Sequence, residues 1–249
     1  GQVEPVLCNI RDDASVASVM QGADAVVNCV GVLGELGKNS FDAVHAEGAA
    51  RIARLAAEAG IDRMVHVSAL GADAEADSAY QQSKAEGEAG VLAHMPAAMI
   101  LRPSVIFGPG DGFSNRVASM SRMGPFLPIV GGNTKFQPIY VEDVAKAAVL
   151  GVEGAATGTF ELGGPDVDTL RGLIEGMLDV IHRRRVILNL PFGLGSVMAF
   201  FFDLAQTPTG GLVKNAVLTR AQVKSLKVDN VVSEAAQTLA DLAITATAT

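Results

Sequence analysis

Predicted strands and helices alternate along the first two thirds of this chain. The strands are short runs rich in valine and isoleucine, and Ala25–Gly31 is apolar enough to be buried on both faces of a parallel sheet. Alanine and leucine at helical spacing predict a helix over 42–59, with Gly60 as its C-cap. This alternation favours an α/β fold with a doubly wound parallel sheet. The expected strands are 3–10, 25–31, 64–68, 98–102 and 159–162.

The regular alternation ends near residue 165, which sets the expected domain organisation. We expect one α/β domain over 1–165, with a lobe inserted at about 112–137, and a small, mostly helical C-terminal lobe over 166–249. That lobe should serve substrate or partner docking. It contains a basic run, His182–Arg185, and an apolar stretch with three adjacent phenylalanines, Phe200–Phe202. We expect the phenylalanines to form a lobe core, with a membrane or partner face as the alternative.

Composition excludes several classes of protein. A chain of 249 residues with 49% hydrophobic residues can bury a large core. Its net charge of -8 argues against a nucleic-acid partner, because such binding relies on clustered lysine and arginine. Cys8 and Cys29 lie in apolar runs and are expected to be buried, reduced thiols. No signal peptide or spanning run is visible, so we expect a soluble or peripheral protein whose two ends look trimmed.

A tyrosine and a lysine four residues apart, Tyr80 and Lys84, form the clearest chemical pattern. On a helix both side chains leave from one face, about one turn apart. A lysine ammonium beside a phenol favours the phenolate and lowers the pKa of the tyrosine, which suits acid–base work near neutrality. A Tyr/Lys pair on an ordinary amphipathic helix is the alternative reading.

Polar and glycine-rich segments follow the ends of the predicted strands. Gly31, Ser68, Arg102–Ser104 and Phe107–Gly108 all occupy such positions. The carboxyl ends of parallel strands meet at one edge of the sheet, where ligands of open α/β folds bind. Ser68 is therefore expected to reach the same substrate oxygen as Tyr80, unless it only caps the next turn.

These segments resemble the short-chain dehydrogenase/reductase family, in the extended and atypical branches that include NAD-dependent epimerases and dehydratases. Within it, the chain is similar to the nucleotide-binding accessory subunits of respiratory complex I and their bacterial relatives. The segments that carry the family resemblance are 28–31, 67–71, 80–84, 101–111 and 138–145, and those specific to the accessory subunits are 45–49, 67–73, 83–88, 218–223 and 229–233.

The resemblance implies a role for each matching residue. Tyr80 would be the catalytic acid or base, Lys84 would bind the nicotinamide ribose and bias Tyr80 toward phenolate, and Ser68 would orient a substrate carbonyl or hydroxyl. The implied cofactor is NADP or NAD, with NADPH slightly favoured, and no metal. The implied cofactor-binding residues, from the adenine side to the nicotinamide, are Asn9, Ile10, Val30, Gly31, Val67, Lys84, Pro103, Ser104 and Val105.

Three departures from the family pattern stand out. The first strand with its glycine-rich, pyrophosphate-binding loop is missing, and so is the next strand, which distinguishes NAD from NADP. Active members often carry asparagine where this chain has His45. We therefore interpret the chain as a fragment and expect these 249 residues alone to bind dinucleotide weakly or not at all.

Three functional hypotheses follow from the resemblance. The first is an accessory nucleotide-binding subunit of a respiratory NADH:quinone oxidoreductase, with complex I subunits as partners at a membrane surface. It would lie on the cytoplasmic side of a bacterial inner membrane or the matrix side of a mitochondrial one. The second is a free, cytoplasmic NAD(P)-dependent oxidoreductase or epimerase acting on a small carbonyl or sugar nucleotide through Tyr80. The third is a redox sensor that binds dinucleotide without chemistry. The four histidines lack the spacing of metal ligands.

Overall fold

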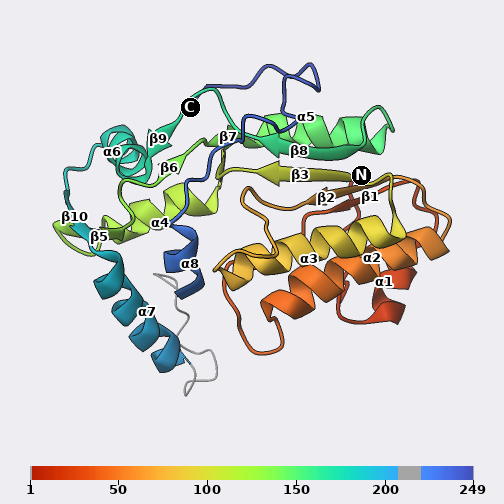
Figure 1. Ribbon diagram of the computed structural model, residues 1–249, viewed down its shortest axis with the longest axis horizontal. Helices are drawn as coiled ribbons and strands as arrows, with labels where there is room; N and C mark the ends of the chain where they lie inside the picture. The colour runs from red at the N-terminus through yellow and green to blue at the C-terminus, as the bar shows by residue number, and fades with distance from the viewer. Residues whose placement is uncertain (1, 207–219, 249) are drawn as a thin grey trace. The chain divides into compact units, whose positions relative to one another are not determined.

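The computed structural model describes residues 2–206 and 220–248, with the side chains of 200–206 and 220 outside the description. The chain forms two compact units, residues 1–102 with 146–160 and residues 103–145 with 161–249 (Figure 1). Each unit is therefore built from separate segments of the chain. The domain boundary expected at residue 165 stays a prediction.

A four-stranded sheet is centred on the first unit and has the order β1-β2-β3-β8. β1 (Val26–Asn28) pairs in parallel with β2 (Met64–Val67), and β2 pairs in parallel with β3 (Met99–Pro103), while β8 spans Gly158–Leu162. The parallel sheet predicted from the alternation of elements is thus confirmed.

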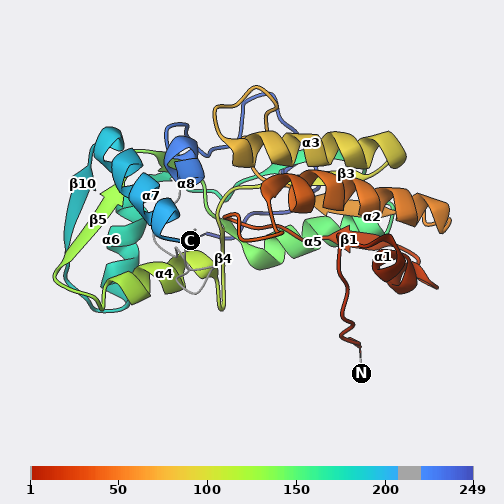
Figure 2. The ribbon, with the colours of Figure 1, turned by 90° about the horizontal axis from the view of Figure 1, so that it is seen from below.

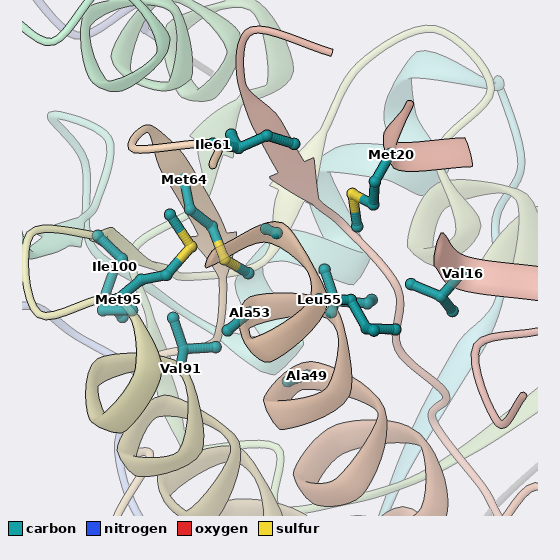
Figure 3. Close-up of a cluster of buried hydrophobic side chains, with 13 residues drawn as sticks. Val16, Met20, Ala49, Ala53, Leu55, Ile61, Met64, Val91, Met95 and Ile100 are labelled. Carbon is teal, nitrogen blue, oxygen red and sulfur yellow. The ribbon is translucent and has the colours of Figure 1, made fainter. Parts of the chain in front are cut away.

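Helices cover both faces of this sheet. On one face Met64 joins a cluster of buried side chains from α1 (Asp13–Met20), α2 (Glu47–Glu58) and α3 (Ala79–His94), shown in Figure 3. On the other face, Val65 and Met99 pack closely against Gly151 of α5 (Val141–Val152). Because neighbouring side chains of a strand point to opposite faces, one continuous apolar run serves both layers.

The helix predicted over 42–59 is present, with a change of type near its start. Asp42–Ala46 form a π-helical turn, η1, and α2 follows directly. Gly60 ends α2 with a φ of +79°, and the amide of Ile61 donates to the carbonyl of Ala56, as in a Schellman C-cap. The predicted C-cap is therefore confirmed.

The strand expected at 3–10 does not form. These residues have no regular secondary structure, and Figure 2 shows the N-terminal end of the chain running away from the rest of the first unit. Val3 is 84% exposed and Leu7 is fully exposed. β-branched residues favour extended backbone, but a strand also needs a ladder partner, and the described sheet pairs with other segments.

Two further predictions about this region are wrong for a related reason. β1 is short and stands at the edge of the described sheet, so Val27 remains 45% exposed and is not buried on both sides. Cys8 and Cys29 are free and exposed, and neither is a core thiol. An apolar run predicts burial only when neighbouring elements cover it.

In its described residues the second unit contains three two-stranded sheets. β4 (Ile106–Phe107) pairs with β7 (Ile139–Tyr140), β5 (Phe126–Val130) with β10 (Val186–Leu190), and β6 (Lys135–Phe136) with β9 (Asp168–Thr169). Its described helices include α4 (Gly112–Met120), α6 (Leu170–Val180), α7 (Phe192–Gln206) and α8 (Arg220–Ser225). A core of Val117, Leu127, Ile129, Ile174 and Ile187 joins α4, α6, β5 and β10.

The basic run of the second unit has a structural use. Arg185 Nε donates to the carbonyl oxygen of Ser121 at 2.7 Å, and Arg183 Nη1 donates to the same oxygen at 3.3 Å. Ser121 is the C-cap of α4, where backbone carbonyls lack helical partners and attract cations. The prediction that Phe200–Phe202 form a lobe core falls on side chains outside the description. Residues 218 and 219 of the segment 218–223 are likewise outside the described residues.

None of the described helices combines the length and the apolar character needed to cross a bilayer.

Candidate functional site

The candidate site lies in the first unit, where β1 and β2 end beside α3. Gly31 follows β1 and Ser68 follows β2, while Tyr80 and Lys84 lie on α3. α3 packs closely on η1, since a Cβ on Gly87 would overlap the carbonyl oxygen of His45. The parallel order of β1 and β2 brings their carboxyl ends to one edge, as the sequence predicted.

Lys84 is the buried cation of this edge. Lys84 is only 5% exposed. Its Nζ donates a long hydrogen bond, 3.4 Å, to the Val67 carbonyl oxygen. Burial lowers the pKa of Lys84 to about 8, and the charge of Glu88 opposes that shift. An ammonium has three donors, so this contact leaves capacity for oxygen atoms of a ligand.

Gly31 faces Lys84 directly. A Cβ at this position would lie 3.3 Å from Lys84 Nζ and 3.5 Å from His45 Nε2. The absent side chain keeps the backbone after β1 close to the ammonium. A nucleotide that approached this loop would meet backbone and a positive charge together.

Glu88 sits one turn beyond Lys84 and is itself paired. Its carboxylate is 5% exposed and accepts from Arg102, with Nη2 to Oε2 at 2.6 Å and Nε to Oε1 at 2.9 Å. Buried carboxylates need such partners, because desolvation otherwise disfavours their charge. The carboxylate next to Lys84 is therefore already paired with Arg102.

Tyr80 does not have the pKa expected from the sequence. Burial raises the pKa of Tyr80 to about 12, and desolvation is the sole cause. The ring lies edge-on to His45 at 5.4 Å and to Phe41 at 5.8 Å between centroids. The expected lowering of the Tyr80 pKa by Lys84 is wrong, because loss of hydration of the phenolate outweighs any help from the ammonium.

His45 links the loop after β1 to α3. The Val32 amide donates to His45 Nε2 at 2.9 Å, and His45 Nδ1 lies 2.9 Å from Ser83 Oγ. Ser83 Oγ in turn donates to the Tyr80 carbonyl oxygen at 2.9 Å. Burial, helped by the charge of Lys84, lowers the pKa of His45 to about 4 and keeps the ring neutral.

Two buried polar atoms beside Lys84 have no hydrogen-bond partner among the described residues, Ser68 Oγ and His66 Nε2. Asn28 Nδ2 lies 3.0 Å from His66 Nδ1, while its Oδ1 accepts from the Val30 amide. Nδ1 of His66 is therefore an acceptor, and Nε2 carries the proton as an unused donor. Burial lowers the pKa of His66 to about 3, which fixes this neutral form.

The other predicted cofactor-binding residues are placed differently. Asn9 is exposed, and its Oδ1 accepts from the Arg11 amide, while the Ile10 side chain packs toward Gly48 of α2. Pro103, Ser104 and Val105 lead into and belong to the second unit. There the Ser104 hydroxyl, 5% exposed, is bonded to Asn230 Oδ1 at 2.7 Å.

Sequence reasoning missed the roles of His66, Asn28 and Ser83 in this network. His66 lies on β2 and Ser68 comes two residues later, so the period of two of an extended chain could have placed their side chains on one side. Ser83 lies three residues after Tyr80, one helical turn along, which is the available signal for its contact with that turn. Within the described residues no group of three His, Cys, Asp or Glu side chains could hold a metal ion.

The first unit thus has a parallel α/β sheet with a buried lysine and a close-packed glycine after its strand ends, the edge at which open α/β folds bind ligands. The chain belongs to the NAD dependent epimerase/dehydratase family, whose model matches residues 2–163.

Several curated relatives are similar along most of the chain. It is 36% identical over 97% of its length to NADH dehydrogenase [ubiquinone] 1 alpha subcomplex subunit 9 of Arabidopsis thaliana, covering 62% of that protein. It is 29% identical over 98% of its length to the NADH-ubiquinone oxidoreductase 40 kDa subunit of Neurospora crassa, covering 63%. A ceramide reductase of Caulobacter vibrioides is 28% identical over 84% of the chain, which covers 67% of that enzyme. The chain thus spans less than two thirds of the first two relatives.

Solved structures share the fold. A dTDP-4-dehydrorhamnose reductase of Clostridium acetobutylicum aligns with a TM-score of 0.63 at 19% identity, over 73% of this chain and 71% of that one. A Bacillus anthracis enzyme of the same name, solved with NADP, gives 0.61 at 17% identity over 74% and 72%. The Bordetella bronchiseptica enzyme WbmG, solved with NAD, gives 0.61 at 17% identity over 75% and 66%.

Proposed function

We propose that this chain is the nucleotide-binding part of an accessory subunit of a respiratory NADH:quinone oxidoreductase. The observation that carries the proposal is the similarity of almost the whole chain, 36% identical over 97% of it, to a protein named as a subunit of such an enzyme. The protein would lie at the membrane surface through its partner subunits, on the cytoplasmic side in a bacterium or the matrix side in a mitochondrion.

The proposed ligand is NADPH or NADH, with NADPH favoured. Lys84 would bind ribose hydroxyls, since it is buried and has spare donors beside Gly31. Val30 and Val67 would shape the same edge, and Asn9 and Ile10 would meet the adenine end. Pro103, Ser104 and Val105 are proposed to line the nicotinamide side.

We propose that this site holds its nucleotide and does not turn it over. A phenol with a pKa near 12 is protonated at neutral pH, which argues against Tyr80 as a base that takes a proton from an alcohol substrate. Tyr80 and Ser68 would then position the bound nucleotide through hydrogen bonds. Binding without chemistry suits a subunit whose role is assembly or stability.

Purification of the full-length protein from its source under gentle detergent tests the proposal. We expect it to isolate with the other subunits of the respiratory enzyme and with a bound dinucleotide. Isolation as a free protein that reduces or oxidises a carbonyl compound would overturn it.

A free NAD(P)-dependent oxidoreductase or epimerase is the second candidate. It is favoured by the similarity to a protein named ceramide reductase and by the presence of Tyr80, Lys84 and Ser68 at one strand edge. In that case a bound nucleotide would have to lower the pKa of Tyr80. Loss of carbonyl turnover in Tyr80→Phe, with nucleotide affinity unchanged, would support this candidate.

A further inference from the structure

The contacts of His45 are compatible with one neutral form of its ring. The Val32 amide can only donate, so Nε2 of His45, 2.9 Å away, must be unprotonated. The neutral ring then carries its proton on Nδ1, which donates to Ser83 Oγ at 2.9 Å. The Ser83 hydroxyl in turn donates a hydrogen bond to the Tyr80 carbonyl oxygen. All donors therefore point from the loop after β1 toward α3.

The ring is also held from its faces and edges. It stacks on Phe41 with centroids 5.5 Å apart and planes 22° apart, and Tyr80 meets it edge-on. His45 is 2% exposed and belongs to the π-helical turn η1, a kind of distortion that is frequent at functional sites. This packing leaves the imidazole little freedom to choose other partners.

We propose that His45 is a positioning residue that ties the loop after β1 to the Tyr80 turn of α3. The bond to Val32 fixes the backbone next to Gly31, and the bond to Ser83 fixes the turn that presents Lys84. His45 thereby sets the spacing between Gly31 and the Lys84 ammonium. Its consequence for nucleotide affinity rests on the function proposed above.

Two substitutions of His45 distinguish a histidine that only fills the core from one whose hydrogen bonds join two segments. His45→Phe keeps an aromatic ring against Phe41 and Tyr80 but loses both hydrogen bonds. His45→Gln loses the ring but keeps an acceptor for Val32 and a donor for Ser83. His94→Gln, at the exposed end of α3, is the matched control.

The first measurement is nuclear magnetic resonance of the full-length protein with labelled histidine, with His45 assigned by its loss in His45→Gln. We expect His45 at neutral pH to show an unprotonated Nε2 and a protonated Nδ1. Exchange of the Val32 amide should accelerate at least tenfold in His45→Phe and stay near wild type in His45→Gln and His94→Gln. A protonated Nε2, or equal Val32 exchange in His45→Phe and wild type, would overturn the proposal.

The second measurement is titration of the same variants with NADPH and NADH. We expect His45→Phe to weaken binding about tenfold, and His45→Gln to recover most of it. Equal affinity of His45→Phe and wild type would overturn the link from His45 to the ligand. If wild type binds neither nucleotide, the proposed function fails, whereas the tautomer and the Val32 exchange still decide the role of His45.

A second variant is available should His45→Phe fail to fold. Ser83→Ala removes the hydrogen bond between His45 Nδ1 and Ser83 Oγ and is also expected to weaken nucleotide binding. Unchanged binding in Ser83→Ala would count against the proposal.

Discussion

Asn28 Nδ2 lies 3.0 Å from His66 Nδ1, across the paired strands β1 and β2. This contact commits the buried His66 to its neutral form, with a proton on Nε2 that no described residue accepts. A second buried histidine, His45, is neutral as well. Both side chains would have to remain uncharged for the candidate site to keep its geometry.

Acid should therefore begin to destabilise the protein below about pH 6.5, at a higher pH than the range in which carboxylates become protonated. The pKa values of His45 and His66 in the folded protein, about 4 and 3, lie below the 6.5 of an unperturbed histidine. Between these values the unfolded chain binds more protons, so stability is fully present above pH 6.5 and falls as the pH falls. The slope approaches about 1.4 kcal/mol per pH unit for each histidine. Urea unfolding at pH 5 and pH 7 should show a smaller difference for His66→Gln than for wild type, whereas the exposed control His94→Gln should match wild type. Equal differences in all three would contradict the account.

Lys84→Met should stabilise the protein while it removes ligand binding. The pKa of Lys84 in the folded state, about 8, lies below its ordinary 10.5, so holding the charge at pH 7 costs about 3 kcal/mol. Methionine has a similar length and no charge. We expect a higher free energy of unfolding at pH 7, a gain that shrinks toward pH 10 because wild type itself becomes more stable as Lys84 deprotonates. Thermal melts at both pH values measure this, and a clear loss of stability at pH 7 would argue that the ammonium is well satisfied.

Glu88→Ala should be costly, and Glu86→Ala should not. Glu88 is buried and bound to Arg102 through two nitrogens, so its loss leaves a partly buried guanidinium with fewer acceptors. We expect about 2–3 kcal/mol of destabilisation. Glu86 is exposed on the same helix, and its replacement should change stability by less than about 0.5 kcal/mol. Equal effects in chemical denaturation would refute the importance of the buried pair.

Gly87→Ala should separate α3 from η1. A Cβ at Gly87 would overlap the His45 carbonyl oxygen, which is backbone and cannot move aside cheaply. We expect about 1–3 kcal/mol of destabilisation and faster exchange of the Val32 amide. Gly176→Ala in α6 meets nothing within 4 Å and should gain about 0.5–1 kcal/mol from helix propensity alone. The idea fails if both alanines stabilise the protein.

Much of the fold was predictable because apolar periodicity reports directly on helices and parallel strands. The strands at 64–67 and 99–103 and the C-cap at Gly60 follow from local sequence. The exposure of residues 3–9 and of Cys29 was not predictable, since burial depends on which elements lie alongside.

The candidate site was predictable in its members on α3 and at the strand ends, but not in its electrostatics. Tyr80 and Lys84 were found by their spacing, yet the direction of the Tyr80 pKa depends on burial against Phe41 and His45. The partners of His45 and His66 come from two separate segments, residues 28–32 and the helix α3, which meet only in the folded chain.

The most direct test of the central claim is the affinity of the full-length protein for NADPH and NADH, wild type against Lys84→Met and Gly31→Ala. A Cβ at Gly31 would make a tight 3.3 Å contact with Lys84 Nζ, and methionine at position 84 removes the proposed ribose ligand. The account predicts binding by wild type and at least a tenfold loss in both variants, with the control Gly176→Ala unchanged. Binding of equal strength in wild type and Lys84→Met, or no binding by wild type, would contradict it.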